Sequence, residues 1–222
     1  NSGVYNEPKT YVKVLANDNS TVVLEKETEQ RVAMKETTAY LMTDMLRRAV
    51  NESGGTGGGA RFSGMHIAGK TGTTNDNYDR YFTGYTPYYC AAVWTGYKSN
   101  EKISYSGNPA ITMWKKVMQK IHEELPNKDF DKPSTGLETI QVCLDSGLLP
   151  SDACSQDVRG SRIVSVEVAA GTGPKETCSM HVLRDYCTEG KCLAGEFCPA
   201  DSVVQKAFLD YERTDYGSGI TA

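Results

Sequence analysis

The segment from Lys70 to Thr74 (Lys-Thr-Gly-Thr-Thr) carries the side chains best suited to chemistry in this chain. An ammonium group such as that of Lys70 attracts a carboxylate and favours deprotonation of neighbouring groups. The hydroxyl groups of Thr71 and Thr73 are donors for the same carboxylate. Because Gly72 has no Cβ, a peptide can lie against the backbone there. The segment therefore indicates a site for an anionic, peptide-like ligand.

The same lysine completes the nucleotide-binding pattern G-x-x-x-x-G-K-[ST] over residues 64–71. A P-loop follows a buried strand and opens a helix whose N-terminal amides hold phosphate. In this chain a glycine-rich stretch precedes the pattern, and residues 71–77 follow it without helical periodicity. The interior positions of the pattern are also bulky and apolar, so the sequence disfavours nucleotide binding.

Lys70-Thr71-Gly72 also matches the K-T-G triad of penicillin-recognising serine enzymes. Three residues alone occur often by chance, but the surrounding segments make the match specific. Residues 1–125 resemble the late part of the transpeptidase domain of class A penicillin-binding proteins, the bifunctional peptidoglycan synthases. The segments that carry this resemblance are Asn1–Tyr5 with Pro8, Ala39–Leu46, Gly55–Gly57, Ala68–Asp76, Asp79–Pro87 and Ala92–Tyr97.

The resemblance implies a peptidoglycan D,D-transpeptidase that works through an acyl-enzyme on a serine. Its donor is a stem peptide ending in D-Ala-D-Ala, the amine of a neighbouring stem attacks the acyl-enzyme, and β-lactam antibiotics acylate the same serine. No cofactor is expected. Lys70 and the amide N–H of Thr73, one of two oxyanion donors, are the expected catalytic groups. The expected substrate-binding residues are Lys70, Thr71, Gly72, Thr73 and Thr74.

No serine in the chain fits the role of nucleophile. Ser99-Asn100-Glu101-Lys102 matches S-x-x-K and Ser106-Gly107-Asn108 matches S-x-N, but both follow K-T-G, whereas the family order places them before it. S-x-x-K also needs a helix start that puts serine and lysine on one face. We therefore expect the nucleophile upstream of Asn1, in the N-terminal half of the same domain, and an isolated chain that is inactive.

Two other functions stay open. A D,D-carboxypeptidase or β-lactamase of the same superfamily shares K-T-G, although the residues around Tyr81–Tyr97 favour the class A synthases. The chain is alternatively a non-catalytic cell-wall binding module. The family implies an upstream glycosyltransferase domain and a membrane anchor, which would place this chain at the extracytoplasmic face of the bacterial membrane.

Cysteines are concentrated in the last third of the chain. Residues 1–142 hold one, Cys90, which we interpret as a buried small hydrophobe in an apolar strand. An extracytoplasmic location favours disulfides, and six cysteines would form three bridges with 15 alternative pairings. The disulfide candidates are Cys143, Cys154, Cys178, Cys187, Cys192 and Cys198.

A metal site is the alternative for part of this set. Cys178-Ser-Met-His181 has ligand spacing, which allows zinc at Cys178, His181, Cys187, Cys192 and Cys198. Free thiols are the third interpretation. The other histidines, His66 and His122, are interpreted as packing or surface residues.

Periodicity predicts the elements that position the K-T-G segment. Two β-branched runs, residues 10–15 and 21–25, indicate a hairpin, and a helix is predicted over residues 38–50 before a flexible glycine loop. Asn108 and Pro109 open a second helix with an apolar stripe through Leu125. Strands are predicted at 65–71, 79–85 and 88–97, the last buried on both faces, and at 139–143 and 163–168. The fold class is α+β, an antiparallel sheet with flanking helices.

Composition divides the chain into three parts. We expect the closing half of a transpeptidase domain at 1–125, a polar linker at 126–138, and a Cys-rich appendage at 139–222 that is mostly irregular or β. The formal net charge is −4, with no basic patch, which argues against nucleic acid. The sequence has no apolar run of membrane-spanning length, so we expect membrane attachment only through the upstream anchor.

Overall fold

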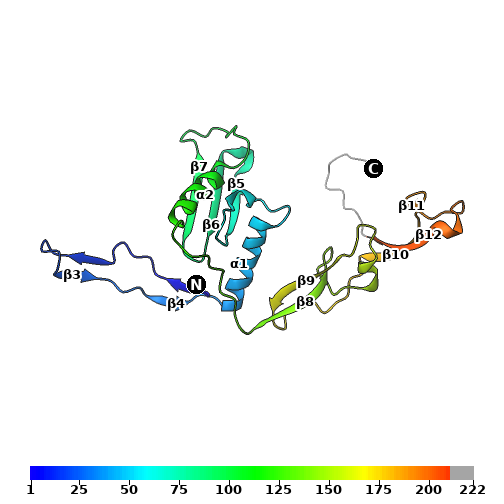
Figure 1. Ribbon diagram of the computed structural model, residues 1–222, viewed down its shortest axis with the longest axis horizontal. Helices are drawn as coiled ribbons and strands as arrows, with labels where there is room; N and C mark the ends of the chain where they lie inside the picture. The colour runs from blue at the N-terminus through cyan, green and yellow to red at the C-terminus, as the bar shows by residue number, and fades with distance from the viewer. Residues whose placement is uncertain (211–222) are drawn as a thin grey trace. The chain divides into compact units, whose positions relative to one another are not determined.

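The computed structural model describes residues 1–210, which divide into two compact units, Asn1–Thr135 and Gly136 onward (Figure 1). The first unit mixes helices with antiparallel strands and the second is built from short strands, so the α+β prediction is confirmed. Within residues 1–210, no helix combines the length and apolar character that crossing a bilayer requires.

A ladder of short strands opens the first unit. Strand β1 (Val4–Asn6) pairs with β4 (Gln30–Val32), and β2 (Lys13–Leu15) pairs with β3 (Val22–Glu25), all antiparallel. The predicted hairpin is therefore present. All the residues of β2 and β3 are exposed, so this ladder depends on backbone pairing rather than on burial.

The centre of the first unit is a three-stranded antiparallel sheet in the order β5-β6-β7, formed by β5 (Ala68–Thr73), β6 (Asp79–Tyr85) and β7 (Cys90–Gly96). Helix α2 (Pro109–Ile121) packs on β6 and β7, and helix α1 (Glu36–Asn51) packs on β5. Figure 1 shows both helices, in blue and green, beside this sheet.

Helix α2 begins where its sequence signals predict. Asn108 accepts a hydrogen bond from the amide of Ala110 at 3.0 Å, and Pro109 occupies the first helical turn. Trp114 is completely buried, donates from Nε1 to the carbonyl of Ala91 at 3.0 Å and meets the Phe82 ring edge-on at 5.1 Å. The stripe is shorter than predicted, because the helix ends at Ile121, before Leu125.

Two predictions about β7 are wrong. The strand is not buried on both faces: Ala91 and Val93 pack against the core, whereas Trp94 on the other face is 51% exposed. Cys90 is exposed rather than buried. Because α2 packs on one face of β7, an almost wholly apolar strand still alternates between partly buried and exposed side chains.

The glycine-rich stretch after α1 packs closely against the helix, contrary to the predicted flexible loop. It includes the short helix η1 (Gly58–Ala60). A Cβ at Gly55 would lie 2.4 Å from the carbonyl oxygen of Ala49, so only glycine fits there. The amide of Gly57 donates to the same carbonyl at 2.9 Å.

The second unit contains more strand than predicted. Strands β8 (Leu137–Cys143) and β9 (Ile163–Ala169) form the expected antiparallel pair. A second sheet in the order β11-β10-β12 was not predicted; it consists of β10 (His181–Cys187), β11 (Cys192–Leu193) and β12 (Val203–Leu209). Short helices η3 (Asp152–Ser155) and η4 (Ala200–Ser202) lie between strands.

Candidate functional site

The K-T-G segment occupies strand β5 at an edge of the central sheet. Lys70 pairs with Thr83, Thr71 with Phe82 and Gly72 with Tyr81 on β6. The Lys70 side chain is exposed, and its Nζ donates to the carbonyl oxygen of Thr71 at 3.1 Å. The strand therefore holds the ammonium group at its surface.

Thr56, in the glycine-rich stretch, completes a small polar cluster with Lys70 and Thr71. The Thr56 and Thr71 hydroxyl oxygens lie 2.8 Å apart, and Lys70 Nζ donates to both, at 3.4 and 3.3 Å. One cation and two hydroxyl groups gathered at an exposed edge strand match the needs of a carboxylate ligand. Sequence reasoning did not select Thr56 as a site residue, although Gly55-Thr56-Gly57 was part of the family resemblance.

The backbone of Thr73 points toward the open edge of β5. Successive N–H groups of an extended strand point to opposite edges. The amide of Thr74 donates to the carbonyl of Asp79 at 3.1 Å, which is the β6 side. The amide of Thr73 is therefore directed away from β6, where a ligand lying along the edge would meet it.

The Thr74 hydroxyl is engaged in the turn between β5 and β6. Its Oγ1 accepts from the amide of Asp79 at 2.8 Å and donates to the Asp79 carboxylate at 3.2 Å. Asp79 also accepts from Trp94 Nε1 at 2.7 Å. These bonds give Thr74 a role in shaping the turn at the end of the K-T-G strand.

Gly72 faces a closer neighbour than the sequence indicates. A Cβ placed there would lie 3.2 Å from Cβ of Tyr81 on β6. Glycine at this position thus serves cross-strand packing as well as access to the backbone.

The structure separates the other lysine and serine patterns from this cluster. Residues 64–71 run into a strand, with only the three-residue helix η2 (Asn75–Asn77) after it, so the geometry of a P-loop is not formed. Ser99 lies in a loop and hydrogen-bonds to Glu101, while Lys102 pairs with Asp76 at 3.4 Å.

The two histidines of the first unit, His66 and His122, lie outside the Lys70 cluster. His122 is buried, with its ring nitrogens 2.6 Å from the carbonyl oxygen of Met118 and 2.8 Å from the hydroxyl of Thr86. His66 lies 3.5 Å from Asp129.

A cavity of about 740 Å³ near the start of α1 is lined by neither Lys70 nor Thr71, so we assign no part of this site to it.

The six cysteines of the second unit fall into two groups of three, and no disulfide joins any of them in the structure. Cys143, Cys154 and Cys178 are buried together beside His181 at one end of β10. Cys187, Cys192 and Cys198 lie at the other end, where Cys187 pairs with Cys192 across β10 and β11. Six residues of strand separate the two ends by about 20 Å. Because a disulfide needs Cα atoms within about 7 Å, this arrangement allows at most one bridge in each group.

Two families match the chain, one on each unit. The family described as "Penicillin binding protein transpeptidase domain" matches residues 1–120, which include the whole Lys70–Thr56–Thr71 cluster. The family described as "Penicillin-binding protein 1A, C-terminal domain" matches residues 133–183. The chain belongs to the penicillin-binding protein transpeptidase family, as its residues predict.

Similar proteins named penicillin-binding protein 1A extend over much of the chain. The protein from Clostridium botulinum strain Langeland is 36% identical over 222 residues, 99% of this chain and 26% of that protein. The one from Clostridium perfringens strain ATCC 13124 is 37% identical over 82% of this chain and 22% of its own length. The chain thus spans about a quarter of the length of these relatives.

A solved structure supports the fold. The crystal structure of penicillin-binding protein 1A from Haemophilus influenzae aligns with a TM-score of 0.61, covering 79% of this chain and 31% of that one, at 17% identity. At this identity the match supports the arrangement of helices and strands alone.

Proposed function

We propose that the first unit forms one wall of the active site of a peptidoglycan D,D-transpeptidase, which cross-links stem peptides in cell-wall synthesis. The observation that carries the proposal is the cluster of Lys70 Nζ with the hydroxyls of Thr56 and Thr71 on the open edge of β5. It lies in the segment that matches the transpeptidase family.

In this role the cluster binds the terminal carboxylate of the D-Ala-D-Ala donor. Lys70 supplies the charge, and Thr56 and Thr71 supply hydroxyl donors within reach of it. Hydrogen bonds to a charged group are worth about 1.5–3 kcal/mol each, enough to orient the donor on the strand. β-Lactams carry a carboxylate in an equivalent position and would bind the same cluster.

The strand edge then positions the scissile carbonyl. A peptide lying along β5 would meet the outward amide of Thr73, which acts as one of two oxyanion donors as acyl transfer proceeds. Removing one such donor commonly slows acyl transfer by about 10²–10³-fold. The acylated serine would come from the upstream half of the domain, since the S-x-x-K at Ser99 lies in a loop.

An extracytoplasmic location for this activity is part of the proposal, and the similarity to proteins named penicillin-binding protein 1A supports it. Because the chain spans about a quarter of their length, we propose that the parent protein also carries a membrane anchor and a glycosyltransferase domain. The chain would then work at the extracytoplasmic face. The second unit would belong to the same side.

Labelling with fluorescent penicillin tests the proposal. The 222-residue chain alone should remain unlabelled, and a protein that joins it to the upstream half should be labelled on one serine of that half. Lys70→Ala in the joined protein should abolish labelling, whereas Lys102→Ala, the matched exposed lysine of the loop, should leave it unchanged. Labelling of the isolated chain, or of the Lys70→Ala protein at the wild-type rate, would refute the proposal.

A further inference from the structure

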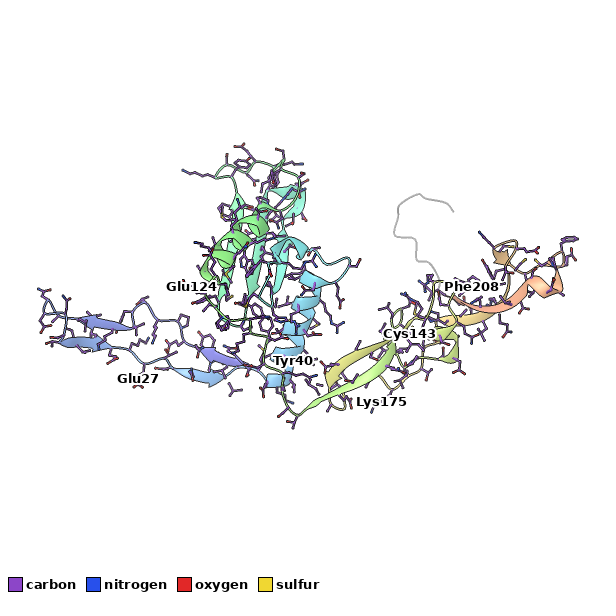
Figure 2. The ribbon with its side chains drawn as sticks, viewed as in Figure 1. Glu27, Tyr40, Glu124, Cys143, Lys175 and Phe208 are labelled. Atoms are coloured by element: carbon purple, nitrogen blue, oxygen red, sulfur yellow. The ribbon has the colours of Figure 1, made fainter. Side chains whose placement is uncertain are left out.

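Four side chains of the second unit converge although they are far apart in sequence. Cys143 ends β8, Cys154 lies in η3, Cys178 precedes β10 and His181 begins it. All four are buried, and their Sγ atoms and one ring nitrogen lie within 4.8 Å of one another. Figure 2 labels Cys143 at this end of β8.

The distances match a shared tetrahedral centre. The Nδ1 atom of His181 lies 3.5 Å from Sγ of Cys143, 3.5 Å from that of Cys154 and 3.4 Å from that of Cys178. With Zn–S at about 2.3 Å, Zn–N at about 2.05 Å and tetrahedral angles, sulfur and nitrogen would lie about 3.6 Å apart. The chain therefore already has nearly the spacing that zinc requires.

Hydrogen bonding does not account for this arrangement. A ring nitrogen has either one proton or one lone pair, so it forms one good hydrogen bond and not three. A disulfide does not account for it either, because joining two of the sulfurs would leave the third thiol and the histidine nitrogen buried beside it. An ion at the centre satisfies all four groups together.

Two carboxylates lie beside the other ring nitrogen of His181, Nε2, and favour metal binding by Nδ1. Its Nε2 lies 3.3 Å from a carboxylate oxygen of Asp145 and 3.2 Å from one of Asp157, although neither contact has hydrogen-bond alignment. Arg159 and Arg162 pair with these two aspartates in turn. Carboxylates at Nε2 keep the proton there and leave Nδ1 free to bind a metal, as is usual for histidine ligands.

The cluster is also the core of its region. The three cysteines form the buried centre, and among residues 1–210 only Ile163 and Met180 pack against it as larger apolar neighbours. A region with so small an apolar core needs a covalent or metal cross-link to be stable.

We propose that Cys143, Cys154, Cys178 and His181 bind one structural zinc ion. Four protein ligands fill a tetrahedral shell, and a closed shell is typical of structural rather than catalytic zinc. The set shares Cys178 and His181 with the site expected from sequence, and replaces Cys187, Cys192 and Cys198 by Cys143 and Cys154. It also replaces the disulfides expected for the three buried cysteines.

Metal analysis of the full chain tests the ligand set. The chain is purified under anaerobic conditions with neither a thiol reductant nor a chelator and is supplied with zinc. Its zinc and iron contents are measured by elemental analysis and its mass by intact-mass spectrometry. We expect about one zinc per chain and none of the two-dalton loss that formation of a disulfide would cause. Cobalt substitution should give the intense visible bands of tetrahedral thiolate coordination, a test that needs no variant.

Two variants separate the proposed site from the other thiols. Cys143→Ser should lower bound zinc at least tenfold, and Cys192→Ser should leave it unchanged. The proposal fails if the wild-type chain binds no zinc and shows no cobalt bands, if iron occupies the site, if a two-dalton loss reveals a bridge among the buried cysteines, or if Cys192→Ser removes the metal. Because the wild-type measurements stand alone, a Cys143→Ser chain that does not fold leaves the test decisive.

A further pair of variants tests Asp157 as a positioning residue. Asp157→Asn should weaken zinc binding by about 10–100-fold in competition with a chromophoric chelator. It should also shift the ring-nitrogen NMR signal of His181, which a general loss of stability would not do. Asp185→Asn, at an exposed position of β10, should change neither measurement.

Discussion

Replacing Gly69 by alanine should destabilise the first unit by crowding its core immediately before the K-T-G triad. Gly69 and Gly84 face each other across β5 and β6. A Cβ at Gly69 would lie 2.7 Å from Cζ of Phe82 and 3.0 Å from Cα of Gly84. Phe82 is completely buried against Trp114, so its ring has little room to move.

The expected cost follows from the size of that overlap. Adding a methyl group to a packed core typically costs about 1–3 kcal/mol. For a unit of this size one kcal/mol lowers Tm by about 4 °C, so Gly69→Ala should lower it by about 4–12 °C. Thermal unfolding followed by tryptophan fluorescence measures the shift, since both tryptophans, Trp94 and Trp114, lie in the first unit.

Two further variants identify the cause of the loss. Gly58→Ala is the matched control: its Cβ would meet nothing closer than 3.7 Å, and its Tm should stay within about 2 °C of the wild type. Phe82→Leu removes the outer ring atoms, so Gly69→Ala should cost less in that background, with a coupling of about 0.5–3 kcal/mol. An unchanged Tm for Gly69→Ala, or the same loss in both backgrounds, would refute the packing argument.

Three other predictions concern single side chains. Thr56→Val in the penicillin-reactive parent should slow acylation about tenfold, since about 1.4 kcal/mol of binding at Lys70 is lost; an unchanged rate would remove Thr56 from the site. Asn108→Ala should cost about 1 kcal/mol of unfolding free energy in urea titration, because the cap of α2 is lost; an unchanged midpoint would contradict this. Hydrogen bonds from Thr21 and Ser20 hold the pKa of Asp18 well below its ordinary value of 3.8. The turn stability that they supply should therefore be present above that value and lost as the pH falls through the lowered pKa. An NMR titration checks this, and Thr21→Val should move the pKa upward.

Sequence signals predicted the bounds of an element correctly where those bounds depend on nearby residues alone. Asn108 and Pro109 fix the start of α2, and the predicted strand at 79–85 has the same limits as β6. The burial of β7 was misjudged because it depends on which face of the sheet α2 covers, and the apolar run of β7 does not reveal this. Strands β10 and β12 were missed because few of their residues are fully buried, two in β10 and one in β12, and because they pair over about 20 intervening residues.

The proposed metal ligands were also only partly predictable, because contacts between residues distant in sequence determine them. The pair Cys178 and His181 is visible in sequence because three residues separate them. Sequence proximity then favours the cysteines that follow, but β10 carries Cys187 about 20 Å from His181. The actual neighbours, Cys143 and Cys154, lie up to 38 positions earlier and are brought close by the β8–β9 pair and η3. Thr56 was overlooked for the same reason: its contact with Thr71 forms only once the glycine-rich stretch packs on α1.

The position of His181 at the start of β10 also has a kinetic consequence. Strand β12 pairs with β10 along its whole length, and its Ala207 exchanges backbone hydrogen bonds with Gln156 and Val158, next to Cys154. Strands β10 and β12 are therefore linked to the zinc ligands at both His181 and Cys154. We expect these parts to unfold as one cooperative unit. Removing the ion should make this unit susceptible to proteases in a single step. Cleavage sites should then appear together across residues 143–209 rather than one after another.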